Sequence, residues 1–227
     1  MELKNTVAVV TGANRGLGRH LAAQLVERGA KVYAAARRPE TVDLPGVTPL
    51  RLDVTDQESI QEAARIASDA TLLINNAGVS TGATLVGGDL GEVRREMETN
   101  FFGPLLTTRA FAPVIEGNGG GVLNVLSALS WFHPAGLGSY AATKAAAWAL
   151  SDATREELAP RGIAVSALHV GYMDTDMAAA VPADQKADPV EVAAHALRAI
   201  EEGLPEVLAD ETSRLVKASL SGTPAAA

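Results

Sequence analysis

The chain alternates short apolar runs with helix-length segments from one end to the other, and this alternation limits the folds open to it. Strands are predicted at Thr6–Val10, Lys31–Ala35, Thr48–Leu52, Thr71–Ile74, Val122–Leu126, Ile163–Leu168 and Glu206–Ala209. The clearest runs are apolar nearly throughout, as strands buried on both faces of a sheet must be. Helical patterns fill the intervals, at Gly16–Arg28, Gln57–Ser68, Leu90–Glu116, Ser139–Ala159 and Pro189–Glu202. Such alternation predicts an α/β fold, a doubly wound parallel sheet of about seven strands with helices on both faces.

The length suits one domain covering residues 1–227, with 222–227 as a flexible tail. Hydrophobic residues make up 47% of the chain and charged residues 20%, a balance typical of globular proteins. We find no linker and no internal repeat. The glycine-rich stretch Gly117–Gly121 is interpreted as a turn.

Charge and cysteine content exclude several kinds of partner. The net charge is −8 and no Lys/Arg cluster exceeds a pair, so the chain lacks the basic footprint of a nucleic-acid or anionic-membrane surface. Without cysteine there is no disulfide framework and no thiolate metal site, and the four histidines show no metal-ligand spacing. The N-terminus has no apolar signal core and no run of about 18 apolar residues occurs, so we expect a cytoplasmic protein.

A glycine-rich turn follows the first predicted strand and leads into a helix. It runs Thr11-Gly12-Ala13-Asn14-Arg15-Gly16-Leu17-Gly18. Glycines let the backbone turn sharply close to a ligand, and a helix N-terminus offers free N–H groups to a pyrophosphate. An isolated match of this kind often marks only a turn. The strand–turn–helix context favours a dinucleotide site in a Rossmann-type sheet.

Tyr140 and Lys144 stand four residues apart in a predicted helix with Ser139 as its N-cap, so they share one helix face. A nearby ammonium favours the phenolate and lowers a tyrosine pKa from about 10, which would suit general acid–base work on a carbonyl/alcohol couple. The alternative is a solvated lysine beside an interfacial tyrosine. The pair is weak evidence by itself.

Two further residues lie where they would reach the same site. Ser127 directly follows the strand Val122–Leu126, at the edge of a parallel sheet where ligands bind. Ser130 competes for the same role, and serines at strand ends are usually turn formers. Asn100 precedes Pro104 by four residues, so its carbonyl loses a helical donor and the helix should kink. That carbonyl would either hold a water beside Lys144 or be hydrated at the surface.

Together these motifs resemble the short-chain dehydrogenase/reductase family in its compact form, over about Thr6 to Asp210. The turn matches the family's TGxxxGxG, and Asn75-Asn76-Ala77-Gly78 matches its NNAG segment. The tetrad Asn–Ser–Tyr–Lys and the adenine-contacting Asp-Val pair are also present. Their residues are Asn100, Ser127, Tyr140, Lys144, Asp53 and Val54.

The resemblance implies a role for each residue. Tyr140 would protonate the carbonyl oxygen as hydride leaves the nicotinamide, while Ser127 polarises that oxygen. Lys144 would bind the nicotinamide ribose, and Asn100 would anchor a relay water. The implied cofactor-binding residues are Gly12, Asn14, Arg15, Gly16, Leu17, Gly18, Arg37, Arg38, Asp53, Val54, Asn76, Ala77, Gly78, Tyr140, Lys144, Gly171 and Thr175. One departure is Val170, where the family usually has proline, which puts the rigidity of the following loop in doubt.

The end of the second strand predicts NADP(H) rather than NAD. An acidic residue about 20 positions beyond the glycine turn usually binds the ribose 2′-hydroxyl of NAD, but here Ala36 stands at that position and Arg37 and Arg38 follow. Arginine suits a 2′-phosphate because its planar fork donates parallel hydrogen bonds. Arg15 would approach the same phosphate. The alternative is that these arginines are solvated loop residues.

The leading hypothesis is an NADP(H)-dependent reductase of ketones or aldehydes, reversible with secondary alcohols. The alternatives are a sugar-nucleotide epimerase-like enzyme and a redox-sensing regulator that binds NADP(H) without turnover. An apolar loop lining predicts a small, neutral, fairly hydrophobic substrate under a short lid; its residues are Leu129, Trp131, Phe132, Met173 and Met177. The Ala-rich helix Ala141–Ala153 carries Trp148, which packs either within the monomer or, as the resemblance suggests, in the interface of a homotetramer or dimer.

Overall fold

The structure, a computed structural model, describes residues 1–221, so the predicted tail at 222–227 lies outside the described residues. Seven parallel strands form one sheet in the order β3-β2-β1-β4-β5-β6-β7. They are β1 (Val7–Thr11), β2 (Lys31–Ala36), β3 (Thr48–Arg51), β4 (Leu72–Asn75), β5 (Gly120–Val125), β6 (Ile163–His169) and β7 (Glu206–Leu208). The predicted α/β fold is confirmed. The strand order reverses between β1 and β4, and ligands of such sheets bind beyond the carboxyl ends of the strands at that point.

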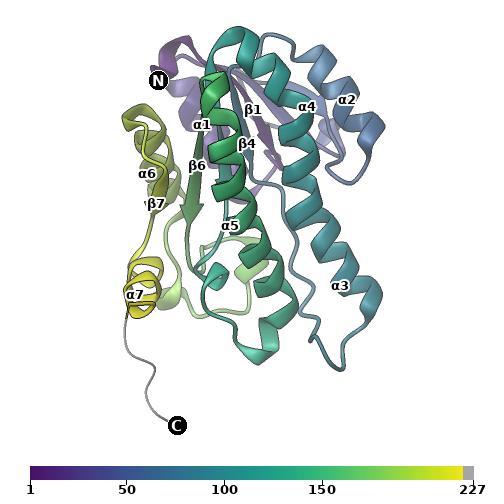
Figure 1. Ribbon diagram of the computed structural model, residues 1–227, viewed down its shortest axis with the longest axis vertical. Coiled ribbons are helices and arrows are strands. Elements are labelled where there is room, and N and C mark those ends of the chain that lie inside the picture. Colours follow the sequence, from purple (N-terminus) through teal and green to yellow (C-terminus); the bar gives the residue numbers. More distant parts are fainter. Residues whose placement is uncertain (222–227) are drawn as a thin grey trace.

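Helices cover both faces of the sheet (Figure 1). They are α1 (Gly16–Glu27), α2 (Gln57–Ile66), α3 (Leu90–Met97), α4 (Gly103–Asn118), α5 (Gly138–Leu158), α6 (Pro189–Glu202) and α7 (Glu211–Ser219). Helices α1 and α6 pack together on one face, whereas α2, α4 and α5 lie on the other. Successive residues of β1 show the division, because Val10 belongs to the first core and Val9 to the second.

The long helix predicted at Leu90–Glu116 is interrupted, as the proline argument requires. A π-helical segment, Glu98–Phe102, separates α3 from α4, and the Gly103 N–H donates to the Glu98 carbonyl five residues earlier. π-Helical turns often mark functional positions. This one carries Asn100, which is 1% exposed.

Two local predictions were wrong, and one helix was not predicted. Gly117–Gly121 is not all turn, because α4 runs to Asn118 and β5 begins at Gly120, where a Cβ would collide with the carbonyl of Thr71, the residue before β4. Ser139 does not cap α5, which begins one residue earlier. Helix α7 was missed, although Asp210 caps it by accepting a hydrogen bond from the Ser213 N–H.

Candidate active site

The glycine-rich turn connects β1 to α1 and has the conformation that its glycines allow. Gly12 and Gly16 have φ angles of 66° and 54°, in the left-handed region that side chains disfavour. A Cβ on Gly18 would collide with the Gly12 carbonyl and the Asn76 side chain, so only glycine lets α1 lie this close to the turn. Leu17 is buried beneath it.

The segment after β4 holds this turn in place through Thr11, a residue that the sequence reasoning did not single out as functional. The Thr11 hydroxyl oxygen accepts hydrogen bonds from the N–H groups of Asn76 and Ala77, both at 3.0 Å. The Asn76 side-chain amide donates to the Thr11 carbonyl at 2.8 Å. The NNAG segment therefore lies directly against the glycine turn, as expected if both contact one ligand.

Tyr140 and Lys144 lie on one face of α5, as their spacing predicts. Lys144 is 5% exposed, and its ammonium donates to the Val125 carbonyl at 2.8 Å, at the end of β5. Its Nζ is 5.6 Å from the centre of the Tyr140 ring. A Cβ built on Gly78 would lie 3.3 Å from the side-chain oxygen of Asn100 and 4.0 Å from the same Nζ, so the NNAG segment lies close to both residues.

The electrostatics of this pair differ from the expectation. Burial lowers the pKa of Lys144 to about 8. The pKa of Tyr140 is raised rather than lowered, because burial of the phenol disfavours its charged form and the negative charge of Glu96 adds to the effect. Desolvation thus outweighs the lysine in this structure, where the ammonium is bound to a backbone carbonyl instead of the phenol.

Ser127 follows β5 directly, and its hydroxyl oxygen accepts a hydrogen bond from the Leu129 N–H at 3.1 Å. Ser130, its competitor, lies in the short 3-10 helix that follows. The Ser130 hydroxyl is buried and has no hydrogen-bond partner among residues 1–221. Both hydroxyls lie near the carboxyl end of β5.

Asn100 joins three segments through its side chain. Its amide accepts from the Val79 N–H at 2.9 Å and donates to the Val79 carbonyl at 2.9 Å. It also donates to the Thr143 hydroxyl at 3.0 Å, one residue before Lys144. The π-helical segment is thereby tied both to the loop after β4 and to α5.

The loop after β6 also approaches the glycine turn. A Cβ on Gly16 would lie 3.5 Å from the Thr175 methyl group. The Gly171 N–H donates to the carboxylate of Asp210, the cap of α7, at 2.7 Å. Val170, in the place of the family proline, is 2% exposed and packs in the core. Asp210 was missed as a site-supporting residue, although the Asp210–Ser213 pattern is a helix-start signal.

The arginines of the predicted phosphate site are exposed. Ala36 ends β2 and is buried, whereas Arg37 and Arg38 face solvent and form no ion pair within the described chain. Arg15 pairs with Asp176 of the loop after β6 at 3.4 Å.

Three other predicted cofactor residues have internal partners. The Asn14 amide donates to the Thr41 hydroxyl at 3.1 Å. Asp53 accepts from the N–H and hydroxyl of Thr55, and Val54 is buried. These contacts orient the loops after β1 and β3.

Trp131 and Trp148 pack within the monomer, which favours the intramolecular alternative for Trp148. Their rings are in edge contact at 5.6 Å, and Trp131 also stacks on His169 at 3.9 Å. Trp131 is 8% exposed and so is not an open lining residue, contrary to expectation, whereas Phe132 and Met177 are more than half exposed.

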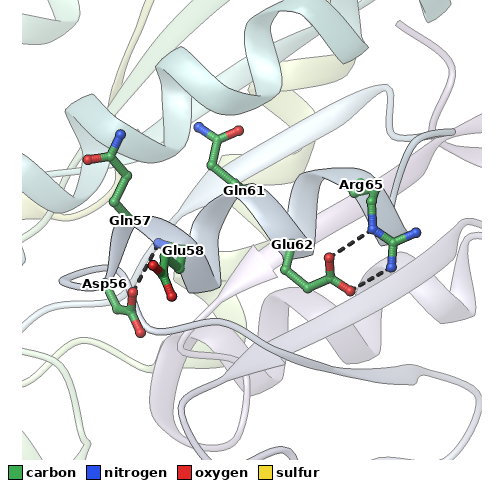
Figure 2. Close-up of a pocket in the computed structure, with 6 residues that line it drawn as sticks. All are labelled: Asp56, Gln57, Glu58, Gln61, Glu62 and Arg65. Atoms are coloured by element: carbon green, nitrogen blue, oxygen red, sulfur yellow. Dashed lines mark hydrogen bonds and ion pairs between the residues drawn. The ribbon is translucent and has the colours of Figure 1, made fainter.

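A surface hollow elsewhere involves none of the candidate residues. Figure 2 shows its lining, polar side chains from the start and outer face of α2, including the ion pair between Glu62 and Arg65 at 2.6 Å. All of these side chains are exposed or nearly so. In residues 1–221 no cluster of three potential metal ligands occurs, and no helix is long and apolar enough to cross a membrane.

Comparison with known proteins agrees with this fold and arrangement. Residues 6–186 match the family model described as short chain dehydrogenase. The chain belongs to the short-chain dehydrogenase/reductase family of oxidoreductases, which confirms the resemblance seen in the sequence.

Individual relatives include both NADP and NAD complexes. A short-chain dehydrogenase from Burkholderia cenocepacia J2315, solved with NADP, has a TM-score of 0.94 and 39% identity, covering 98% of this chain and 95% of that one. Another from Burkholderia phymatum, solved with NAD, has a TM-score of 0.84 and 26% identity, covering 100% and 99%. The NADPH-dependent 1-acyldihydroxyacetone phosphate reductase of Schizosaccharomyces pombe is 33% identical over 183 residues. That match covers 77% of this chain and 62% of the reductase, less than two thirds of its length.

Proposed function

We propose that this protein is an NADP(H)-dependent carbonyl reductase or alcohol dehydrogenase that uses Asn100, Ser127, Tyr140 and Lys144 as its catalytic tetrad. The observation that carries the proposal is the position of Tyr140 and Lys144. Both lie on one face of α5, with the Lys144 ammonium fixed to the end of β5 and the NNAG segment opposite it. A phenol and a buried ammonium at the ligand-binding edge of a parallel sheet suit proton transfer to a carbonyl oxygen.

The residues present fit a dinucleotide. Left-handed Gly12 and Gly16 expose backbone N–H groups at the start of α1, where a pyrophosphate is favoured. Gly78 brings the NNAG backbone close to Lys144, the residue proposed to bind the nicotinamide ribose, since a Cβ there would lie 4.0 Å from the lysine Nζ. When bound, NADP(H) supplies or accepts the hydride. Thr175 lies beside Gly16 of the turn, and Gly171 of the same loop is held by Asp210.

Each tetrad residue has a distinct task in this proposal. The Tyr140 hydroxyl donates its proton to the substrate oxygen during reduction and recovers it from solvent. Ser127 donates a hydrogen bond to that oxygen and orients it. Lys144 binds ribose hydroxyls, and its positive charge stabilises the phenolate that remains on Tyr140. The backbone carbonyl of Asn100 holds a water that passes protons toward Lys144.

NADP(H) is proposed over NAD because of charge. No carboxylate ends β2, and Arg37 and Arg38 stand exposed beside buried Ala36. The relative solved with NADP is more similar to this chain than the one solved with NAD. We further propose that the chain acts as one domain in the cytoplasm on a neutral, apolar ketone, aldehyde or secondary alcohol.

Loss of NADPH absorbance during incubation with a panel of aliphatic and aromatic carbonyls tests the proposal. Turnover of at least one apolar carbonyl with NADPH, and slower turnover with NADH, is expected. Tight NADPH binding without turnover on any member of the panel would contradict it and favour a cofactor-sensing regulator instead.

A further inference from the structure

A second acidic group lies next to this site and has no part in the proposed tetrad. Glu96, in the last turn of α3, is 0% exposed. Charged side chains are rarely buried so completely unless they are paired, and no lysine, arginine or histidine pairs with Glu96 in residues 1–221. One carboxylate oxygen, Oε2, is buried without a hydrogen-bond partner in the same residues. A buried carboxylate oxygen without a partner destabilises the fold, so its presence calls for a structural or functional explanation.

Its other oxygen binds the loop that follows β4. Oε1 accepts hydrogen bonds from the Thr81 N–H and from the Thr81 hydroxyl, the latter at 2.9 Å. Asn100, four residues further along, binds both backbone groups of Val79. Glu96 and Asn100 therefore share one face and hold residues 79–81 at two points.

The face that carries Glu96 and Asn100 belongs to a segment that packs against the helix of Tyr140. Helix α3 and the π-helical segment pack against α5, and Figure 1 shows α3 beside the lower part of α5. Asn100 donates to the Thr143 hydroxyl, and that hydroxyl donates to the Tyr140 carbonyl at 2.7 Å. A continuous chain of hydrogen bonds thus runs from Val79 through Asn100 and Thr143 to the backbone of Tyr140, and Glu96 binds the same loop two residues further on, at Thr81.

The charge of Glu96 also acts on the phenol, since it raises the pKa of Tyr140 in addition to burial. Several titratable groups belong to elements packed around this part of α5, and those of α3 other than Glu96 and of α7 include Glu92, Arg94, Arg95 and Lys217, of which Lys217 lies over the rings of Trp131 and Trp148. Lys144 is on α5 itself and Glu96 is on α3. On β6, burial lowers the pKa of His169 to about 4, so it is uncharged at neutral pH. Glu98 and Arg109, on the π-helical segment and α4, are exposed.

We infer that Glu96 is a positioning residue for the Tyr140 hydroxyl: it fixes residues 79–81 beside the site and places a buried negative charge close to the phenol. This inference rests on the proposed function. The charge disfavours ionisation of the phenol, because a phenolate beside a carboxylate is unfavourable. The protonated phenol is the form that donates to a carbonyl oxygen in the proposed reduction.

Glu96→Gln separates charge from packing. Its amide oxygen still accepts from Thr81, but the negative charge is gone. Glu98→Gln removes the same charge from an exposed position two residues away and is the matched control. Thr81→Val removes one hydrogen bond to Glu96 and leaves its charge, so it tests the effect of loosening residues 79–81 without a change of charge.

The readout is an alkaline titration by NMR of protein labelled with ¹³C at the tyrosine ζ carbon. The chain has three tyrosines, and Tyr140→Phe identifies the Tyr140 signal. We expect Glu96→Gln to move the Tyr140 titration down by roughly one pH unit. Glu98→Gln and Thr81→Val should leave it in place. The pH profile of alcohol oxidation should move in the same direction in Glu96→Gln only, while Thr81→Val should raise KM more than it lowers kcat.

An unmoved Tyr140 signal in a folded Glu96→Gln variant would overturn the inference, as would an equal movement in Glu98→Gln. The titration needs no turnover. A moved signal in a protein with no activity on any carbonyl would therefore support the relation between Glu96 and Tyr140 and would contradict the proposed function instead.

Discussion

The Asn100 side-chain amide donates to the Thr143 hydroxyl at 3.0 Å, and through it the π-helical segment is bound to the helix that carries Tyr140 and Lys144. The same amide exchanges hydrogen bonds with both backbone groups of Val79. The side chain therefore has a task different from that proposed for the backbone carbonyl of the same residue.

Asn100→Ala tests the side chain alone, because alanine keeps the carbonyl. Three hydrogen bonds to buried or partly buried groups are lost, so the free energy of unfolding should fall by about 1–3 kcal/mol. The value of kcat should fall as well, since α5 loses its tie to the loop. Urea unfolding and steady-state kinetics measure the two effects. Asn118→Ala, at an exposed amide bound to the Ser68 carbonyl, is the control, and equal stability losses in the two variants would refute this role.

Tyr140→Phe should reduce kcat by roughly two to four orders of magnitude, the usual contribution of a positioned general acid. Removing one hydroxyl leaves the ring packing intact, so NADPH affinity, measured by fluorescence titration, should change little. Tyr33→Phe removes a phenol bound to Asp69 and serves as control, with near-normal turnover. Near-normal turnover in Tyr140→Phe would mean that another group supplies the proton.

Arg37→Ala should weaken NADPH binding by about 10- to 100-fold and leave NADH binding nearly unchanged. A hydrogen bond to a charged group contributes roughly 1.5–3 kcal/mol, and only NADPH carries the 2′-phosphate. Titrations with both cofactors measure the difference. Ala36→Asp should shift the preference in the same direction, toward NADH, because a carboxylate repels the 2′-phosphate and accepts from the ribose hydroxyl of NADH. Arg65→Ala, on the outer face of α2, is the control (Figure 2). Equal losses for the two cofactors in Arg37→Ala would exclude a phosphate contact.

His169 should make stability fall in mild acid. Burial lowers its pKa from 6.5 to about 4, while its Nδ1 lies 3.2 Å from the Ser127 carbonyl. Between these pH values the unfolded chain binds more protons, so the stabilising contribution is complete above pH 6.5 and is lost as pH falls through 4. The loss should be on the order of 3 kcal/mol.

Urea unfolding of wild type and His169→Asn across this range measures the effect. Asparagine retains a donor near Nδ1 but does not titrate, so the pH dependence should be flatter in the variant. Parallel curves for the two proteins would assign the acid sensitivity to other groups.

Self-association is expected from the Ala-rich face of α5, whose small side chains permit close helix packing. Light scattering at micromolar concentration should give a mass well above the 23.4 kDa of the chain, that of a dimer or tetramer. Trp148 is not the test residue, since it packs against Trp131 within the monomer. Ala149→Glu places a charge on an exposed position of α5 and should lower the mass. A monomeric wild-type protein that turns over substrate would end this prediction.

Local pattern was sufficient for the fold and for the position of much of the candidate site. Apolar runs buried on both faces required a parallel sheet, and the glycines at Gly12 and Gly16 required a left-handed turn at its edge. The spacing of Tyr140 and Lys144 placed them on one helix face, and Pro104 interrupted the helix carrying Asn100. Each of these inferences depends on residues close together in the chain, where geometry follows directly from backbone chemistry.

Contacts between distant segments were decided only by the tertiary structure. Three such contacts join different elements, and no local spacing predicts them. They are the hydrogen bonds of Thr11 with Asn76, of Asp210 with Gly171 and of Glu96 with Thr81. The direction of the Tyr140 pKa shift was also decided only by the tertiary structure. It depends on the balance between burial and nearby charge, and both are properties of packed neighbours rather than of the tyrosine and lysine spacing.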